Sequence, residues 1–264
     1  MPTPHIYKTE VLVLRHLNFG EADRILTVVT PQHGKLRAIA KGSRKVTSKL
    51  ASAVDLVTRA QFVLATGREL DVVTQAVVLE RFDHLRASLW HATAGYTVAE
   101  ALDHALQDRE PHAALYALAL DTLRRLDADA AAWLVDPVAE NQAGPTARGW
   151  AIMRYFDLVL LDLLGYRPAF HHCVACENPL QPVEDNGFNA ELGGAICPSC
   201  SRYSQRRLPL LTLKVLRLVQ TTEWDALPVM RLDARTRDDV EGVLQAILAL
   251  NLERSLKSWN LLHE

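Results

Sequence analysis

All four cysteines of this 264-residue chain fall into two closely spaced pairs. The pairs are Cys173-Val-Ala-Cys176 and Cys197-Pro-Ser-Cys200, with twenty residues between them. One C-x-x-C turn places two thiolates near enough to bind one ion, and a second turn completes a tetrahedral set of sulfur ligands. Because four protein ligands leave no position for a catalytic water, the spacing predicts one structural Zn²⁺ ion per chain.

Disulfide bonds and a redox motif are the alternative uses for paired cysteines. The chain has no signal-peptide core after Met1 and no apolar run long enough to span a bilayer. We therefore expect a cytoplasmic protein with reduced thiols and no membrane partner. A thioredoxin-like motif should lie between a strand and a helix, whereas Pro and Gly surround both pairs here. The adjacent His171-His172 is a further candidate ligand that two complete cysteine pairs make unnecessary.

Charge divides the chain into two parts, although its net charge is only −2. Residues 1–80 carry eleven Lys/Arg against seven Asp/Glu, and residues 81–264 carry eighteen against twenty-four. The change of sign near residue 80 predicts a domain boundary there. The length and the 49% hydrophobic content suffice for one to three domains with buried cores.

The first eighty residues show five short strand-like runs and no long helix. Apolar and β-branched residues alternate or cluster over 6–17, 24–30, 35–41, 54–65 and 69–79. Five strands in this length suit a small closed barrel of the OB-fold type, which commonly binds single-stranded nucleic acid. Strand number alone does not separate this fold from an SH3-like barrel.

A cationic stretch without acidic residues covers 25–54. Its basic residues are Lys35, Arg37, Lys41, Arg44, Lys45 and Lys49. The segment 42–49 is small and polar, so we expect an exposed, flexible loop that follows a phosphate backbone without reading bases. A solvated charged loop is the alternative. Because Phe19 and Phe62 are the only nearby aromatic candidates, backbone contacts should outweigh base contacts.

Beyond residue 81 the apolar residues recur with helical spacing. We expect helices over 85–106, 113–126, 148–164 and 211–220, with a loop at 141–145. A last helix should begin at Thr236 in a capping box with Asp239 and carry Arg254 and Lys257 near its end. These are core helices without assigned chemistry.

The predicted organisation is α+β and multidomain. An OB-fold barrel for nucleic acid occupies 1–80, and a helical domain occupies 81–167 and 208–264, with the zinc module inserted at 168–207. A second acid-free stretch follows the cysteines and contains Arg202, Arg206, Arg207, Lys214 and Arg217. This cluster either extends the nucleic-acid surface or solvates the exit from the zinc module.

Motifs for catalysis are missing from the sequence. It has no phosphate-cradling loop, dinucleotide fingerprint, G-x-S-x-G elbow or H-E-x-x-H helix. A zinc deaminase needs H-x-E upstream of P-C-x-x-C, and here Pro198 follows Cys197 instead of preceding it. The sequence therefore predicts a binding protein and not an enzyme.

Several short motifs, taken in order, resemble the bacterial recombination mediator family RecO. They are Gly20-Glu21-Ala22-Asp23-Arg24-Ile25, Thr30 with His33-Gly34-Lys35, Ala40-Lys41-Gly42-Ser43-Arg44-Lys45, Leu163-Leu164-Gly165-Tyr166 and Arg254-Ser255-Leu256-Lys257-Ser258. The motifs extend over nearly the whole chain. Val46-Thr47 departs from the Pro-Lys that the family often has, and all four zinc ligands are present although some relatives lack them.

The resemblance implies an OB-fold, a helical domain and an inserted zinc module. It also implies a mediator of recombinational DNA repair that binds single- and double-stranded DNA and anneals complementary strands. The implied partners are RecR, the acidic C-terminal tail of single-stranded DNA-binding protein, RecF and RecA, which is loaded on coated DNA. Two other classes stay open, namely a metalloenzyme with an unrecognised site and a zinc-ribbon protein of transcription or translation that prefers RNA.

Overall fold

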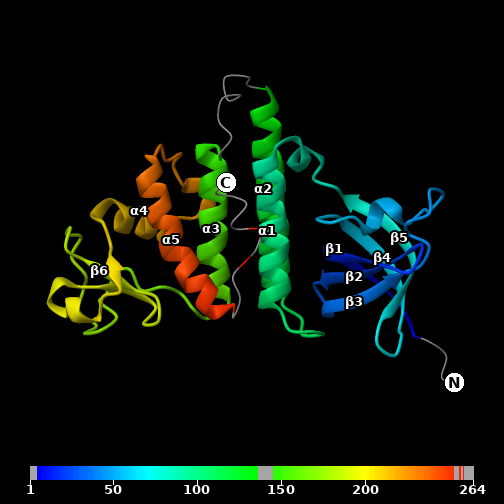
Figure 1. The fold of residues 1–264 in the computed structure, drawn as a ribbon, viewed down its shortest axis with the longest axis horizontal. Coiled ribbons are helices and arrows are strands. Elements are labelled where there is room, and N and C mark those ends of the chain that lie inside the picture. Colours follow the sequence, from blue (N-terminus) through cyan, green and yellow to red (C-terminus); the bar gives the residue numbers. More distant parts are fainter. Residues whose placement is uncertain (1–4, 136–144, 253–255, 257, 259–264) are drawn as a thin grey trace. The chain divides into compact units, whose positions relative to one another are not determined.

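The computed structural model describes residues 5–135 and 145–252, together with Leu256 and Ser258. The described residues form two compact units (Figure 1). One unit contains the residues up to 135 with Leu256 and Ser258, and the other contains 145–252. Ser258 belongs to the first unit because its backbone N–H and hydroxyl donate to the Glu100 carboxylate. Arg254, Lys257 and most of the predicted 141–145 loop lie outside the described residues.

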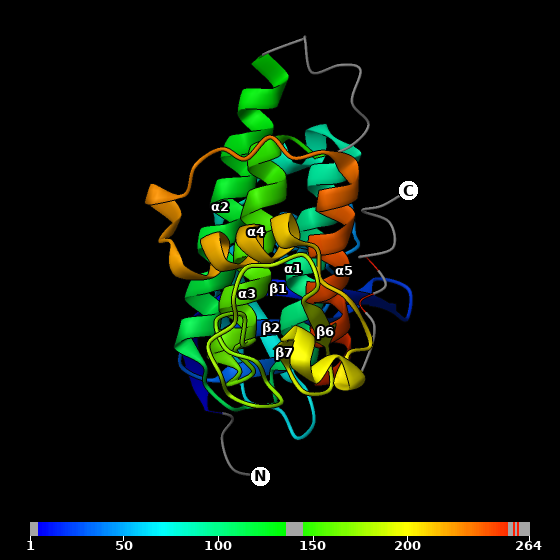
Figure 2. The ribbon, with the colours of Figure 1, turned by 90° about the vertical axis from the view of Figure 1, so that its left-hand side faces the viewer.

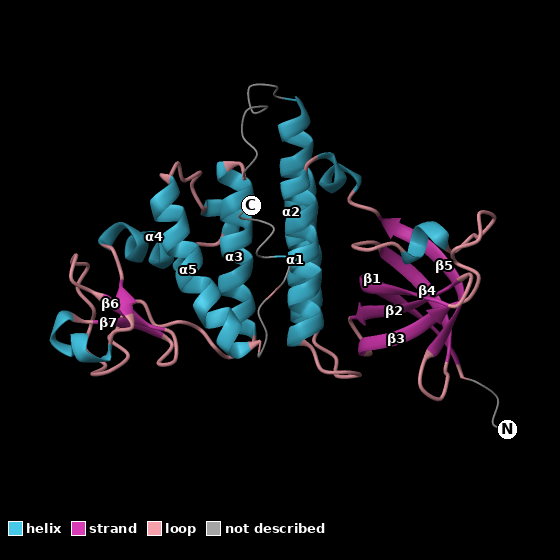
Figure 3. Cartoon of the chain, viewed as in Figure 1, coloured by secondary structure: helices cyan, strands magenta, loops and turns pink. Residues whose placement is uncertain are grey.

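The first unit begins with a closed five-stranded barrel, drawn in magenta in Figure 3. Its strands are β1 (Ile6–Phe19), β2 (Asp23–Thr30), β3 (Gly34–Ala40), β4 (Arg59–Ala65) and β5 (Asp71–Glu80). The strand order is β1-β2-β3-β5-β4, with β3 and β5 parallel and the other pairs antiparallel. This closure is the OB-fold arrangement, so the predicted fold of the first eighty residues is confirmed.

Alternating apolar side chains fill the barrel. Leu36, Ala38 and Ala40 of β3 point inward and are buried, and Phe62 of β4 is fully buried in the same core. Phe62 is therefore a core residue and is not available for base stacking. Figure 1 shows the short helical turn between β3 and β4, where OB-folds place their inserted helix.

The fourth strand starts later than its sequence pattern indicates. Residues Ala51–Val54 form a 3-10 turn that buries Ala53 and Val54 against the barrel core. Val57 then adopts a left-handed backbone conformation, with φ of 54°. The prediction that a strand runs from residue 54 was wrong, because the apolar residues here cap the core instead of extending the sheet.

Two helices complete the first unit, α1 (Leu89–Ala105) and α2 (Ala113–Val135), after a 3-10 turn at Asp83–Ala87. The second helix extends well past residue 126, where the sequence pattern placed its end. Asp129 lies on the buried face, and its carboxylate lies 3.0 Å from Nε2 of His91. The buried His91 ring satisfies the Asp129 carboxylate. The helix can therefore continue past residue 126 although its buried face is not purely apolar.

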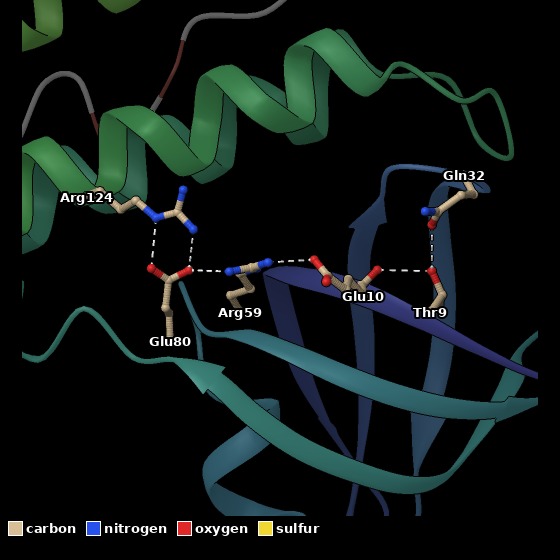
Figure 4. Close-up of polar contacts among 6 residues, drawn as sticks. All are labelled: Thr9, Glu10, Gln32, Arg59, Glu80 and Arg124. Carbon is tan, nitrogen blue, oxygen red and sulfur yellow. Dashed lines mark hydrogen bonds and ion pairs between the residues drawn. The ribbon is translucent and has the colours of Figure 1, made fainter.

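Charged side chains fasten the barrel to α2 (Figure 4). Arg124 donates two 2.8 Å hydrogen bonds to the two carboxylate oxygens of Glu80, at the end of β5. Arg59 of β4 lies between Glu80, at 2.6 Å, and Glu10 of β1, at 2.8 Å. The hydrogen bond from Arg124, followed by the one from Arg59, lowers the pKa of Glu80 from 4.5 to about 2. The Glu80 carboxylate therefore stays ionised and links two strands to the helix.

The second unit contains α3 (Ala147–Leu163), α4 (Leu210–Thr221) and α5 (Ala234–Asn251), together with the cysteine module. Figure 2 shows α4 lying across α3, with the small β6–β7 hairpin beside them. The side chain of Asp233 caps α5 by accepting from the Thr236 backbone N–H at 2.7 Å. The helix thus begins one turn before the predicted Thr236 cap, because Asp233 is the stronger cap available.

Candidate metal centre and nucleic-acid interface

The four cysteines come together at the tips of two turns. Cys173 and Cys176 lie on a turn closed by the Glu177 N–H, which donates to the Cys173 carbonyl at 2.8 Å. Cys197 and Cys200 lie on a second turn, where the Cys200 N–H donates to the Cys197 carbonyl at 3.0 Å. The Cys197 N–H also donates to Sγ of Cys173 at 3.3 Å, which ties the two turns together.

The sulfur positions fit a tetrahedral metal site. All four Sγ atoms lie within 4.8 Å of one another, and those of Cys176 and Cys197 are 3.8 Å apart. Four Zn–S bonds of about 2.3 Å in a tetrahedron place neighbouring sulfurs about 3.8 Å apart, whereas a disulfide requires about 2.05 Å. The geometry is therefore compatible with a structural metal site, and all four cysteines are free of disulfide bonds. Within the described residues this is the one such group of His, Cys, Asp or Glu side chains.

The thiols differ in how readily they ionise. Burial raises the pKa of Cys173, but backbone N–H groups, first that of Cys197, outweigh it and lower the value to about 6. Burial and then the neighbouring Cys176, Cys197 and Cys173 raise the pKa of Cys200 to about 12. Crowded thiolates repel one another, and a divalent cation removes that repulsion, so the four-sulfur set suits a metal better than it suits free thiols.

The module around the cysteines is built on a three-stranded sheet and anchored to α4. Its strands are β6 (Gly187–Asn189), β7 (Gly194–Ile196) and β8 (Arg206–Arg207), in the order β7-β6-β8. Arg217 of α4 donates 2.8 Å hydrogen bonds to the backbone carbonyls of Phe170 and Leu180, which flank the first cysteine turn. Arg217 therefore has a structural role within the second basic cluster.

The basic loop at 42–49 is exposed as predicted, and its first residues are held in place. The backbone N–H of Gly42 donates to the Asp23 carboxylate at 2.7 Å, and that of Arg44 donates to the Ala22 carbonyl at 2.9 Å. Ser43 is buried, whereas Lys41, Arg44, Lys45 and Lys49 are exposed. These bonds hold the first residues of the loop, Gly42 to Arg44, against the β1–β2 turn. The flexibility expected for the loop stays a prediction.

The outer face of β1, β2 and β3 continues this cationic surface. Cross-strand pairing aligns Arg15, Thr27 and Arg37 in one row, with both arginines exposed. The next row on the same face aligns Leu17, Ile25 and Ile39. A basic row beside an apolar row suits a single strand of nucleic acid. The phosphates of that strand can contact the arginines while its bases contact the aliphatic side chains. We refer to these two rows together with Lys41 and the 42–49 loop as the cationic barrel face.

Sequence patterns did not identify Arg15, Leu17, Ile25 or Ile39 as members of this face. The missing information is strand register, because Arg15 and Arg37 are far apart in sequence and align only through Thr27. A β-bulge between Val13 and Arg15 changes which side chains of β1 point outward. Phe19, the other predicted stacking candidate, is half exposed near the end of β1.

Lys35 lies apart from the other predicted basic residues. Its ammonium group donates to the Asp103 backbone carbonyl and lies 3.4 Å from the Asp103 carboxylate and 3.8 Å from that of Asp108. Only 14% of its side chain is exposed. Lys35 therefore holds β3 against the end of α1 and contributes no available charge to the cationic barrel face.

The arginines after the cysteines are also largely engaged within the protein. Arg206 donates to the Asp239 carbonyl at 3.0 Å, and Arg207 donates to the Glu184 carbonyl at 3.1 Å and pairs with its carboxylate at 3.6 Å. Arg202 is exposed and lies 4.7 Å above the ring of Tyr203. Residues 168–207 carry four carboxylates against three arginines. Contact of Arg202, Arg206 and Arg207 with DNA stays a prediction, and the local charge does not favour it.

Comparison with known proteins agrees with a DNA-repair protein built on an OB-fold. Residues 3–82 match the family described as "Recombination protein O N terminal", and residues 141–260 match "Recombination protein O C terminal". The chain is 36% identical over 255 residues to the DNA repair protein RecO of Roseiflexus sp. (strain RS-1), covering 96% of this chain and 83% of that protein. It is 34% identical over 257 residues to the RecO of Pelotomaculum thermopropionicum, covering 96% and 92%.

These matches place the chain among the proteins that repair DNA by recombination. Within that class, the chain belongs to the RecO family. Membership implies DNA binding in recombinational repair, which agrees with the OB-fold and the cationic barrel face. The described helices include none that is both long and apolar enough to cross a bilayer.

Proposed function

We propose that this protein is a recombination mediator that binds single- and double-stranded DNA, anneals complementary strands and helps to load RecA on DNA coated with single-stranded DNA-binding protein. The observation that carries the proposal is the cationic barrel face. Arg15 and Arg37 lie in one row, and Lys41, Arg44, Lys45 and Lys49 are exposed in the segment that follows β3.

Annealing on this face needs no covalent step. Each Lys or Arg that meets a phosphate releases condensed counterions and screens the repulsion between two strands. Contacts to the backbone leave the base edges available for pairing with a second strand. The anchored start of the loop, Gly42 to Arg44, supports this role, because a pre-ordered cationic surface loses less entropy when the strand binds. We assign no catalytic residue and propose no enzymatic activity.

Zinc is the proposed cofactor, with one ion held by Cys173, Cys176, Cys197 and Cys200. The sulfur spacing and the closed ligand set support Zn²⁺ in a structural role. When bound, the ion neutralises part of the thiolate charge and couples the folding of the 168–207 module to metal binding.

The proposed partners follow from family membership. They are RecR, the acidic C-terminal tail of single-stranded DNA-binding protein, and RecF and RecA. A protein with these partners acts on chromosomal DNA, so the proposal places it at the nucleoid in the cytoplasm. Membership of a DNA-repair family supports DNA over the RNA substrates that a zinc-ribbon protein of transcription or translation would prefer.

A strand-annealing assay tests the proposal. Two complementary oligonucleotides, naked or precoated with the cognate single-stranded DNA-binding protein, are mixed with the full chain in buffer without added Mg²⁺ or nucleotide triphosphate. We expect the protein to accelerate the annealing of both naked and coated strands. Annealing breaks and forms no covalent bond, so it requires neither ATP nor a loop that binds its phosphates. Strict dependence on ATP hydrolysis by the protein, or no acceleration on either substrate, would overturn the proposal.

A further inference from the structure

Three aromatic rings gather on the barrel, apart from the basic loop. His5 precedes β1, Tyr7 lies in β1, and His33 lies in the turn between β2 and β3. The rings of His5 and Tyr7 are nearly parallel, at 14°, with centroids 6.4 Å apart. The ring of His33 meets Tyr7 at 62° with a centroid distance of 4.9 Å. We call these three residues the aromatic cluster.

The central ring of the aromatic cluster is fixed by a buried carboxylate. The hydroxyl of Tyr7 donates to Asp71 at 2.6 Å, and Asp71 is fully buried. The other oxygen of Asp71 accepts from the Gly67 backbone N–H at 3.1 Å. Burial and then the bond to Asp71 raise the pKa of Tyr7, so its hydroxyl remains a donor. The Tyr7 ring also packs against the barrel core, and it therefore holds one orientation.

The turn that carries His33 is fixed as well. The hydroxyl oxygen of Thr30 accepts from the His33 backbone N–H at 2.8 Å, and the same hydroxyl donates to the Gly34 carbonyl at 3.2 Å. Gly34 has φ of +67° and lies directly against the backbone of Glu110. The two imidazoles are exposed, so they flank an ordered, half-buried tyrosine at the surface.

The surroundings of the aromatic cluster favour a base over a phosphate. The Asp108 carboxylate lies 3.8 Å from the Lys35 ammonium group, exposed Glu110 has its backbone against Gly34, and Arg109 lies 3.4 Å from the Asp71 carboxylate. This neighbourhood has no excess of positive charge for a phosphate backbone. Flat, ordered rings are instead the partners that unpaired bases use, because every base presents a π-face.

We propose that the aromatic cluster stacks an unpaired base of a single DNA strand whose phosphates run along the cationic barrel face. This inference rests on the proposed function and gives the barrel a preference for single strands over duplex. It also revises the expectation that base contacts are minor, since histidines and a tyrosine supply the rings that the sequence pattern did not bring together.

The test compares wild type with the double variant His5→Ala, His33→Ala in equilibrium binding at pH 8. Three probes of equal length are used: an oligothymidylate, an abasic strand and a duplex. Stacking is worth about 1–3 kcal/mol per base, so we expect the variant to bind oligothymidylate about fivefold or more weakly. Binding to the abasic strand and the duplex should be unchanged, with the same salt slope, because no phosphate contact is lost.

Controls separate stacking from loss of fold. Tyr7→Phe keeps the ring and removes the bond to Asp71, so it should lower thermal stability while keeping the preference for the base-bearing strand. Val77→Ala removes an exposed barrel side chain outside the cluster and should bind as wild type does.

Three outcomes would count against the inference in different ways. If the double variant binds each of the three probes as tightly as the wild type does, the stacking inference is overturned and the proposed function stands. Normal DNA binding with loss of annealing only on coated strands would overturn it in favour of a protein-docking role. Failure of the wild type to bind any probe would overturn both proposals.

Discussion

Replacing Arg44, Lys45 and Lys49 together with alanine tests the DNA path on the barrel. All three side chains are exposed. The variant removes one 3.3 Å hydrogen bond from the Arg44 guanidinium to the Gly20 carbonyl and keeps those that the backbone N–H groups of the loop donate, so the fold should tolerate the change. The proposed phosphate contacts are Arg15, Arg37, Lys41, Arg44, Lys45 and Lys49. Lys35 is left out because Asp103 and Asp108 already neutralise it.

The magnitude follows from counterion release. Each phosphate contact on single-stranded DNA contributes roughly −0.7 to the slope of log K against log salt, so six contacts give a slope of about −4. Loss of three contacts should shallow the slope by about two units and weaken binding by about 100-fold at 0.1 M salt. Because backbone contacts carry no base information, the loss should be equal for all sequences.

Fluorescence anisotropy with a labelled oligonucleotide, at several salt concentrations, measures both the affinity and the slope. A matched control removes the same charge from the second unit through Arg202→Ala, Arg207→Ala and Lys214→Ala, and should leave the slope near the wild-type value. Wild-type affinity and slope in the loop variant would refute the reasoning. A shallower slope in the control instead would place the DNA along the zinc module.

Three further predictions concern the metal site, the ion pairs of Glu80 with Arg59 and Arg124, and Gly34. Purified protein should carry about one zinc per chain, and Cys176→Ser should lose the metal and unfold the 168–207 module while the barrel stays folded. Because the folded pKa of Glu80 is about 2 and its ordinary value is 4.5, its contribution to stability is present above the ordinary value and lost as pH falls through the folded one. Gly34→Ala should destabilise by more than about 2 kcal/mol, because φ is +67° and the new Cβ meets the Glu110 backbone oxygen.

Each of the three has its own measurement and control. Metal analysis of unoxidised protein checks the zinc site, and a metal-free, folded preparation would contradict it. Between pH 5 and about 2, the free energy of unfolding should fall less for Glu80→Gln than for wild type. Identical pH dependence of the two proteins would show that the Glu80 ion pairs do not stabilise the fold. Gly20→Ala, with φ of +55° and no atom within 4 Å, is the matched control for Gly34 and should cost about 1 kcal/mol.

Local signals predicted the parts of the fold that depend on short-range pattern. The five strands follow alternation, and the cysteine turns follow C-x-x-C spacing, so both were confirmed as a barrel and a four-cysteine cluster. The start of α5 was misplaced because both Asp233 and Thr236 can cap a helix, and the structure uses Asp233, the stronger cap. The length of α2 was underestimated because Asp129 reads as an exposed polar residue until His91 is placed beside it.

The candidate site required tertiary information that the sequence does not supply. Lys35 looks like any other basic residue until Asp103, far along the chain, is brought to its ammonium group. Arg15 joins the cationic barrel face only through the register of three strands. The aromatic cluster is invisible in sequence because His5 and His33 meet through Tyr7 across a closed barrel.

Photo-crosslinking tests the central claim, that DNA runs along the cationic barrel face, most directly. A single strand with photoreactive thymines is bound to the full chain, irradiated and digested, and the crosslinked peptides are mapped by mass spectrometry. The account predicts crosslinks within residues 5–49, with none above background in 202–214. Crosslinks confined to 202–214, with the barrel peptides unmodified, would contradict it.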